Sequence, residues 1–109
     1  IGGNNEWANL DVVNLLCELI DARFADDKTL ASRFPDSPCA KGGSAKSLIT
    51  FVIDRPGHDT RYAINASKIS SELGYDPVED FDSGLNKTVD WYLTNEAWWR
   101  SIQDGSYRQ

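Results

Sequence analysis

The chain has 109 residues, a formal net charge of −6 and 40% hydrophobic residues. This composition is typical of one folded domain or a large part of one, and it excludes a disordered polyelectrolyte. The acidic balance argues against a general nucleic-acid-binding protein, and no apolar run approaches the roughly 18 residues that a membrane-spanning helix needs.

The first predicted element is a helix over residues 9–24. Val13, Leu16 and Ile20 recur at helical spacing and give this segment one apolar face. Asn9 stands at the start of the pattern, where an Asn side chain is suited to cap the first turn.

The next stretch, residues 24–47, is rich in Ser, Ala, Asp, Pro and Gly. Such a composition predicts a long loop, and we expect one short helical turn in it around residues 28–34. Strand signals follow: residues 48–53 read Leu-Ile-Thr-Phe-Val-Ile and predict a short strand, and residues 61–64 predict a second one.

The carboxy-terminal half is predicted to be helical. A helix is expected over residues 66–73, capped by Asn65 and ended by Gly74, a residue that favours positive φ. A longer helix is expected to begin near Asp82 or Ser83, with the buried positions Leu85, Val89, Tyr92 and Leu93. Asn95 interrupts it before a further helical stretch around residues 96–99.

Together these elements predict an α/β fold, or more strictly an α+β fragment, that is mostly helical and has two or three short strands. So few strands cannot form a free-standing sheet, so we expect them to extend a sheet whose other strands lie elsewhere. The sequence contains no Met. We therefore expect a processed chain or a fragment of a longer protein rather than a complete translation product.

Two cysteines, Cys17 and Cys39, are too few for a disulfide framework or a metal site. We expect both to be free thiols in a reducing, cytoplasmic compartment, with Cys17 in the core. Two glycosylation sequons begin at Asn65 and Asn86, and we expect both to be unmodified.

The candidate binding residues follow the first predicted strand. Residues 41–60 are the only part of this acidic chain in which basic residues outnumber acidic ones, and they include Arg55 and His58 in a turn with Pro56 and Gly57. A guanidinium group suits phosphate oxygens, and a helix N-terminus at Asn9 would supply a second anion contact. From spacing alone, a simple helix cap at Asn9 and a surface Arg at position 55 remain the ordinary alternatives.

Catalytic signals are missing. Tyr62 is not followed four residues later by Lys, so the Tyr-Lys couple of short-chain dehydrogenases is absent. The Gly42-Gly43 pair lacks the spacing of a dinucleotide-binding loop. We therefore expect no catalytic, cofactor-binding or metal-binding residue in this chain. We expect the four tryptophans to be core or interface residues: Trp7, Trp91, Trp98 and Trp99.

Four ordered blocks resemble the dTDP-glucose 4,6-dehydratase family of extended short-chain dehydrogenases/reductases. These blocks are residues 1–13 (Ile-Gly-Gly through Asn-x-Asp-Val-Val), residues 54–64 (Asp-Arg-Pro-Gly-His-Asp-x-Arg-Tyr-Ala-Ile), residues 68–75 and residues 84–93. The resemblance implies that residues 1–109 are the carboxy-terminal nucleotide-sugar-binding portion, and that the amino-terminal NAD-binding Rossmann domain is absent.

The family resemblance also implies an activity. Members are NAD-dependent lyases that oxidise the sugar of dTDP-glucose at C4, eliminate water across C5 and C6, and return the hydride to C6. Asn9, Arg55 and His58 match positions that contact the diphosphate region of the substrate. This sequence departs from the family pattern in a longer segment before residue 48, in Asn65 where Asp is common, and in lacking a Tyr found further along in some members.

The resemblance implies a dTDP-sugar ligand, the rest of the same enzyme as a partner, a homodimeric full-length protein, and neither nucleic acid nor membrane. We expect the 109-residue chain alone to be inactive. Two alternatives stay open: a stand-alone, non-catalytic module that binds a nucleotide sugar or a protein, and part of a related nucleotide-sugar epimerase or dehydratase.

Overall fold

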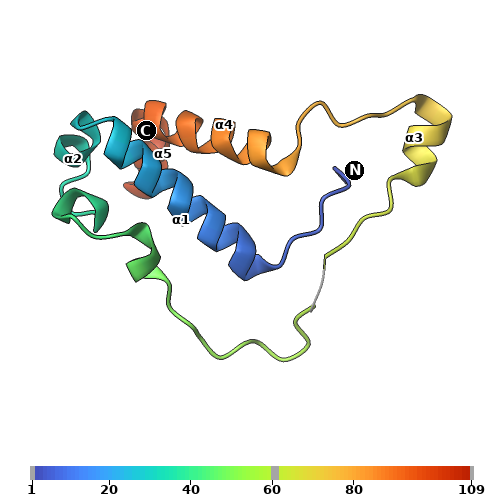
Figure 1. Cartoon of the computed structure of the whole chain (residues 1–109), viewed down its shortest axis with the longest axis horizontal. Helices are drawn as coiled ribbons and strands as arrows, with labels where there is room; N and C mark the ends of the chain where they lie inside the picture. The colour runs from blue at the N-terminus through green and yellow to red at the C-terminus, as the bar shows by residue number, and fades with distance from the viewer. Residues whose placement is uncertain (1, 60–61, 109) are drawn as a thin grey trace.

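The computed structural model describes residues 2–59 and 62–108, and these residues form helices joined by extended segments (Figure 1). The α-helices are α1 (Asn9–Asp26), α2 (Thr29–Arg33), α3 (Ser67–Leu73), α4 (Phe81–Thr94) and α5 (Glu96–Gln103). Three short 3₁₀ turns are η1 (Cys39–Lys41), η2 (Ala45–Leu48) and η3 (Ser106–Arg108). The predicted helices are all present.

Helix α1 begins at Asn9 as predicted, but Asn9 does not cap it. The N-cap is Ala8, which has an extended backbone, and no side chain accepts a hydrogen bond from the first turn. The prediction of Asn9 as the cap is therefore wrong, because the helical backbone already includes this residue. At the other end, α1 continues to Asp26, two residues beyond the predicted limit of 24.

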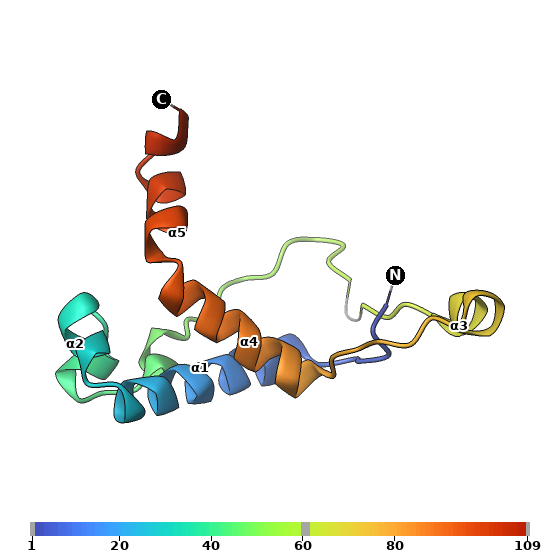
Figure 2. The same ribbon diagram turned by 90° about the horizontal axis from the view of Figure 1, so that it is seen from above.

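Helices α1 and α4 lie side by side and form the body of the molecule (Figures 1 and 2). Arg23 joins them: its Nε lies 2.6 Å from Oδ1 of Asp90, and its Nη2 donates to Oδ1 of Asn86 at 3.0 Å. Cys17 on α1 and Val89 on α4 are buried, as their positions in the helical patterns predict. The pair is therefore held by a small apolar core and an ion pair at its edge.

The connection after α1 is more ordered than a loop. The predicted turn at residues 28–34 is helix α2, and Oδ1 of Asp27 accepts hydrogen bonds from the backbone N–H and the hydroxyl of Thr29 at its start. Residues 39–41 and 45–48 then form η1 and η2, which the composition did not predict.

One carboxylate fastens this connection to α1. Asp21 accepts hydrogen bonds from the Ala45 backbone N–H at 2.8 Å, the Ser44 hydroxyl at 2.5 Å and the Cys39 thiol at 3.1 Å. The Ala45 and Ser44 bonds, in that order, lower the pKa of Asp21, and the Cys39 bond adds to them. Burial, followed by this bond, raises the pKa of the Cys39 thiol. Cys17 and Cys39 are both free.

The predicted strands are not observed. Leu48 ends η2, and residues 49–53 are extended but pair with no other segment in residues 2–59 and 62–108. Tyr62–Ile64 is likewise extended and exposed, and the Arg61 that opens this second predicted strand lies outside the described residues. A strand requires a hydrogen-bonded neighbour, so a strand-like sequence without one stays an isolated extended segment.

Helix α3 stands apart from the α1–α4 body (Figure 1). It begins at Ser67, and its N-cap by backbone geometry is Ala66, although Oδ1 of Asn65 accepts a hydrogen bond from the Ser67 N–H at 2.9 Å. The predicted cap residue thus acts one position early. Gly74 ends the helix with φ of 65°, which confirms the predicted stop.

Helices α4 and α5 meet at Asn95, which is at once the C-cap of α4 and the N-cap of α5. Asp80 caps α4 by accepting from the Ser83 N–H at 2.7 Å, so this helix begins slightly before the predicted Asp82 or Ser83. Beyond Asn95 the chain turns sharply, and α5 projects from the body (Figure 2). The indole N–H of Trp99 donates to the Tyr92 carbonyl at 2.9 Å across this corner.

Few side chains in the described parts of the chain are buried. The buried apolar residues are Cys17, Leu30, Ala45, Ala66 and Val89. Among the described residues, no helix is both long enough and apolar enough to cross a membrane.

Candidate functional site

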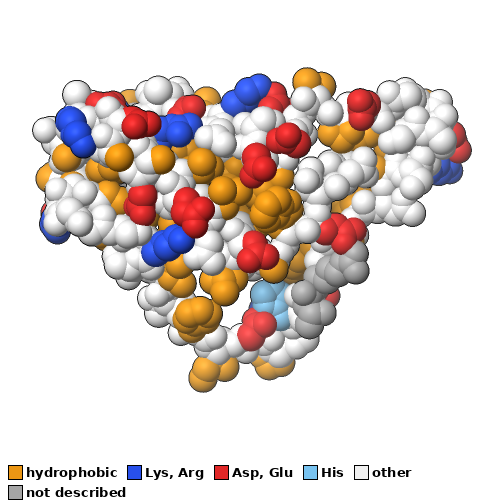
Figure 3. All heavy atoms as spheres, in the orientation of Figure 1, with side chains coloured by type: hydrophobic (Ala, Val, Ile, Leu, Met, Phe, Trp, Pro, Cys, Tyr) orange, Lys and Arg blue, Asp and Glu red, His pale blue; other side chains and the backbone are white. Residues whose placement is uncertain are grey.

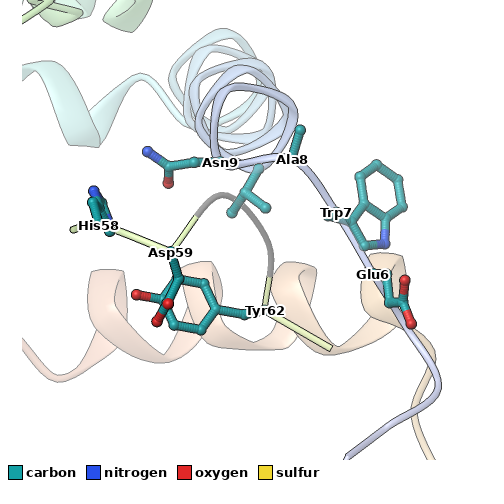
Figure 4. Close-up of a pocket in the computed structure, with 8 residues that line it drawn as sticks. Glu6, Trp7, Ala8, Asn9, His58, Asp59 and Tyr62 are labelled. Carbon is teal, nitrogen blue, oxygen red and sulfur yellow. The ribbon is translucent and has the colours of Figure 1, made fainter. Parts of the chain in front are cut away.

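The candidate site is a hollow of about 570 Å³ where the start of α1 meets the segment around His58 (Figure 4). Eight residues line it: Glu6, Trp7, Ala8, Asn9, Val12, His58, Asp59 and Tyr62. Two of the three predicted binding residues, Asn9 and His58, therefore share one hollow although 49 positions separate them in the sequence.

A tight turn brings His58 to this place. The His58 N–H donates to the Arg55 carbonyl at 3.3 Å and closes a four-residue turn. Pro56 and Gly57 are its central residues, and Gly57 has φ of 73°. Pro followed by a residue of positive φ is the combination that a type II turn requires, so these two residue types explain the local geometry.

The His58 ring is fixed by a neighbour in the same turn. Its Nδ1 lies 2.5 Å from Oδ1 of Asp54, which also accepts from the Arg55 N–H at 2.8 Å. The hydrogen bond from His58 is the largest of the effects that lower the pKa of Asp54, and the Arg55 backbone N–H and the charge of His58 add to it. An ionised carboxylate only accepts, so Nδ1 is the donor and Nε2 is the ring nitrogen available to a ligand.

The start of α1 presents backbone N–H groups that no side chain caps. The N-cap Ala8 offers no side-chain acceptor to the first backbone N–H groups. These groups and the helix dipole make this end of α1 partially positive. The Asn9 side chain is exposed at the same end and is not engaged as a cap. This arrangement can bind an anion through backbone amides, a side-chain amide and a His ring.

Arg55 is placed differently from the other two predicted residues. It is exposed and is not among the residues that line this hollow. Nor does it line a second hollow, of about 580 Å³, which Asn9 and His58 also line. The structure brings Asn9 and His58 together, while the convergence of Arg55 with Asn9 stays a prediction.

Carboxylates surround the hollow and oppose the binding of an anion. Glu6 and Asp59 line it, and Asp54 is paired with His58 at its edge. Because like charges repel, an anionic ligand here needs a cation beside it. Arg55 precedes His58 by three residues and is the nearest basic residue along the described chain, but it does not line the hollow.

Sequence reasoning missed several lining residues. In the sequence, Tyr62 is notable only because it lacks the Lys of a catalytic Tyr-Lys couple. In the structure its ring centroid lies 6.4 Å from that of His58. Trp7 was assigned to the core or an interface, and its ring stacks on Phe81 of α4 with centroids 4.5 Å apart. The usable signals were the four-residue spacing of Asp54 and His58 and the aromatic residue just before α1.

Comparisons with known proteins confirm the family resemblance. The chain is 47% identical over 108 residues to a dTDP-glucose 4,6-dehydratase of Neisseria meningitidis, 46% identical over 107 residues to one of Escherichia coli, and 44% identical over 108 residues to one of Xanthomonas campestris. Each match covers 98–99% of this chain. The chain spans 26–27% of the length of these curated relatives. No model of a protein family matches the chain.

Proposed function

We propose that this chain, which is related in sequence to the dTDP-glucose 4,6-dehydratases, is the carboxy-terminal, substrate-binding portion of such an enzyme. In this proposal the complete polypeptide converts dTDP-glucose to dTDP-4-keto-6-deoxyglucose, and the residues described here hold the nucleotide sugar. The observation that carries the proposal is the shared hollow of Asn9 and His58 at the open end of α1.

The proposed roles follow from the geometry. The diphosphate lies at the start of α1, where the first backbone N–H groups and the Asn9 amide donate to its oxygens. His58 donates through Nε2 when it is protonated, since Nδ1 is held by Asp54. Arg55 neutralises the charge, which the carboxylates of Glu6 and Asp59 otherwise make unfavourable.

NAD, which the family resemblance implies, does not fit the residues described here. Within residues 2–59 and 62–108 there is no parallel sheet and no glycine-rich turn from a strand into a helix, which dinucleotide binding requires. We therefore assign NAD and hydride transfer to the remainder of the polypeptide, and we derive no catalytic step from this chain. The chain alone is expected to be inactive.

The test uses the complete polypeptide that contains this chain. Conversion of dTDP-glucose is measured for the parent protein and for Arg55→Ala, His58→Ala and the control Lys41→Ala. Lys41 is exposed, donates through its amino group to the Asp36 carbonyl at 3.2 Å and does not line the hollow, so its loss leaves the hollow intact.

We expect Arg55→Ala to raise the KM about 10-fold or more, in line with the loss of a charged hydrogen bond. His58→Ala is expected to raise the KM by a smaller factor, and Lys41→Ala to leave it unchanged. If the parent protein binds dTDP but does not convert dTDP-glucose, the chain belongs to a non-catalytic binding module rather than to an enzyme. A parent protein that prefers another nucleotide sugar would place the chain in a related epimerase or dehydratase.

A further inference from the structure

A groove of about 420 Å³ lies at the end of the molecule where α2, α5 and the carboxy-terminal end of α1 come together (Figure 1). Its walls come from α1, η1, η2, α4 and α5 and from the connection after α2. It shares no lining residue with the hollow of Asn9 and His58, so the two are separate in space. Small-molecule sites have volumes of about 300 to 1,000 Å³, and the groove is within that range.

A row of three aromatic rings lines the groove. Phe34 is the middle ring, and its centroid lies 6.3 Å from those of both Phe24 and Trp99. The rings of Phe34 and Trp99 are inclined by only 21° to each other. Such a row offers flat carbon surfaces, on which the ring of a ligand packs by offset or edge-to-face contact.

The groove carries no charge of its own. No Lys, Arg, Asp or Glu is among the lining residues in the described parts of the chain, although such side chains are spread over the helices elsewhere (Figure 3). The guanidinium carbon of Arg33 lies 5.2 Å from the Phe34 ring centroid, and that of Arg100 lies 4.9 Å from the Trp99 ring centroid. Both cations also pair with Glu96, at 3.2 Å and 2.6 Å. Because neither Arg lines the groove, it favours an uncharged ligand over an anion.

The polar groups of the walls are largely engaged within the fold. The indole N–H of Trp99 donates to the Tyr92 carbonyl at 2.9 Å, and the Cys39 thiol donates to Asp21 at 3.1 Å. The exposed amide of Gln103, at the end of α5, can exchange a hydrogen bond with a neutral ligand. A peptide segment would bring an N–H and a C=O with every residue, and these walls offer few partners for them. The groove therefore suits a small molecule better than a chain segment.

We propose that this groove is a binding site for an uncharged aromatic small molecule, which packs against the rings of Phe24, Phe34 and Trp99 and bonds to the Gln103 amide. The site differs from the proposed nucleotide site in chemistry as well as in place. The hollow of His58 offers backbone N–H groups and an imidazole to an anion, whereas the groove offers ring carbon and one amide. The inference does not depend on conversion of dTDP-glucose.

Equilibrium dialysis of the complete polypeptide against N-phenyl-1-naphthylamine, an uncharged aromatic probe, tests the proposal. We expect saturable binding at one site per chain with a dissociation constant of about 1 to 100 µM, the range of a small apolar ligand. Excess dTDP should not displace the probe, because the groove and the hollow share no lining residue.

The thiol of Cys39 locates the bound probe. Cys39 lines the groove, is half-buried and is a free thiol. We expect saturating probe to slow its alkylation by N-ethylmaleimide about 10-fold, as measured by peptide mass mapping at this residue. Binding without protection of Cys39 would place the probe elsewhere and would overturn the proposal.

Two matched substitutions test the chemistry of the site. Gln103→Glu places a carboxylate in the wall, and we expect it to weaken probe binding about 10-fold, because the apolar ligand then covers a charge. Asn14→Asp makes the same change from amide to carboxylate on α1, at a residue that lines neither the groove nor the hollow. We expect this control to bind as the parent does, and equal dissociation constants for the two variants would contradict the proposal.

Three further outcomes would overturn the proposed site. If no saturable binding is found, the groove is covered in the complete polypeptide. If binding appears only after dilution to a monomer, a second copy of the chain occupies the groove. If dTDP displaces the probe, the probe lies in the hollow of His58. Probe binding in a polypeptide that does not convert dTDP-glucose would support the site and refute only the proposed function.

Discussion

The carboxylate of Asp54 lies 2.5 Å from Nδ1 of His58, four residues further along the same turn. This contact fixes the orientation of the His58 ring at the edge of the hollow, and it leaves Nε2 as the nitrogen that can meet a ligand. The turn therefore holds the imidazole in one orientation, and Nε2 donates to a ligand when the ring is protonated.

Asp54→Asn is expected to weaken dTDP binding several-fold, because the neutral amide holds the His58 ring less firmly. The pKa of Asp54 is lowered by the His58 hydrogen bond, so the pair is intact above the ordinary pKa of an Asp, about 3.9. It is lost as the pH falls through the lowered pKa in the folded protein. Titration of the parent and the variant with dTDP at pH 5 to 7, where the pair is intact, measures the expected loss of affinity. Equal dissociation constants would contradict the role of Asp54.

Asn9→Ala is expected to leave stability unchanged and to weaken ligand binding. A true N-cap loses about 1 kcal/mol of stability when it is replaced by Ala, but Asn9 lies inside the helix and caps nothing. Thermal unfolding and dTDP titration of one variant measure both quantities. The matched control is Asp80→Ala, which removes the real cap of α4 and should cost stability without affecting binding. If Asn9→Ala lost as much stability as Asp80→Ala, Asn9 would be a cap of α1 after all.

Asp21→Asn is expected to destabilise the fold by roughly 2 kcal/mol, since the variant loses an ionised acceptor of three hydrogen bonds. The lowered pKa of Asp21 means that its contribution is present above about pH 3.9 and is lost as the pH falls through the folded-state pKa. The difference between the unfolding midpoints of parent and variant should therefore be fully present at pH 6 and should shrink as the pH falls below about 3.9. The control is Asp36→Asn at an exposed position, and an equal effect there would contradict the assignment.

Gly57→Ala is expected to cost about 1 kcal/mol of stability and to weaken binding, because Gly57 has φ of 73°. A Cβ at this position meets nothing within 4 Å, so the penalty is confined to the backbone. Gly84→Ala is the matched control: Gly84 lies in α4, where Ala is the better helix former and a Cβ makes only ordinary contact with Glu79. Unfolding midpoints that move in the same direction for both variants would refute this account.

The sequence predicts the helices well, because their signals are local. The apolar spacing from Val13 to Ile20 and the positive φ of Gly74 act within a few residues of the chain. The strand prediction at residues 48–53 was wrong for a physical reason: the residue types suit a strand, but pairing depends on a neighbour that the described residues lack. Local pattern does not report whether such a neighbour exists.

The candidate site was predicted in part. Asn9 and His58 were proposed from a family resemblance, and the structure places them at one hollow. The lining by Trp7 and Tyr62 could not be read from the sequence, since it depends on how the segment before α1 runs past His58 and Tyr62. The Asp21 cluster was missed for a similar reason, because its three donors lie 18 to 24 positions away along the chain.

The position of Trp7 gives the hollow an optical reporter. The indole stacks on Phe81, lines the hollow and is 44% exposed, whereas Trp91, Trp98 and Trp99 all lie on α4 and α5. A nucleotide that enters the hollow displaces water from the indole and changes its fluorescence emission. Occupancy of the site can therefore be followed by intrinsic fluorescence without any label, and the Trp7→Phe variant separates this signal from that of the other three indoles.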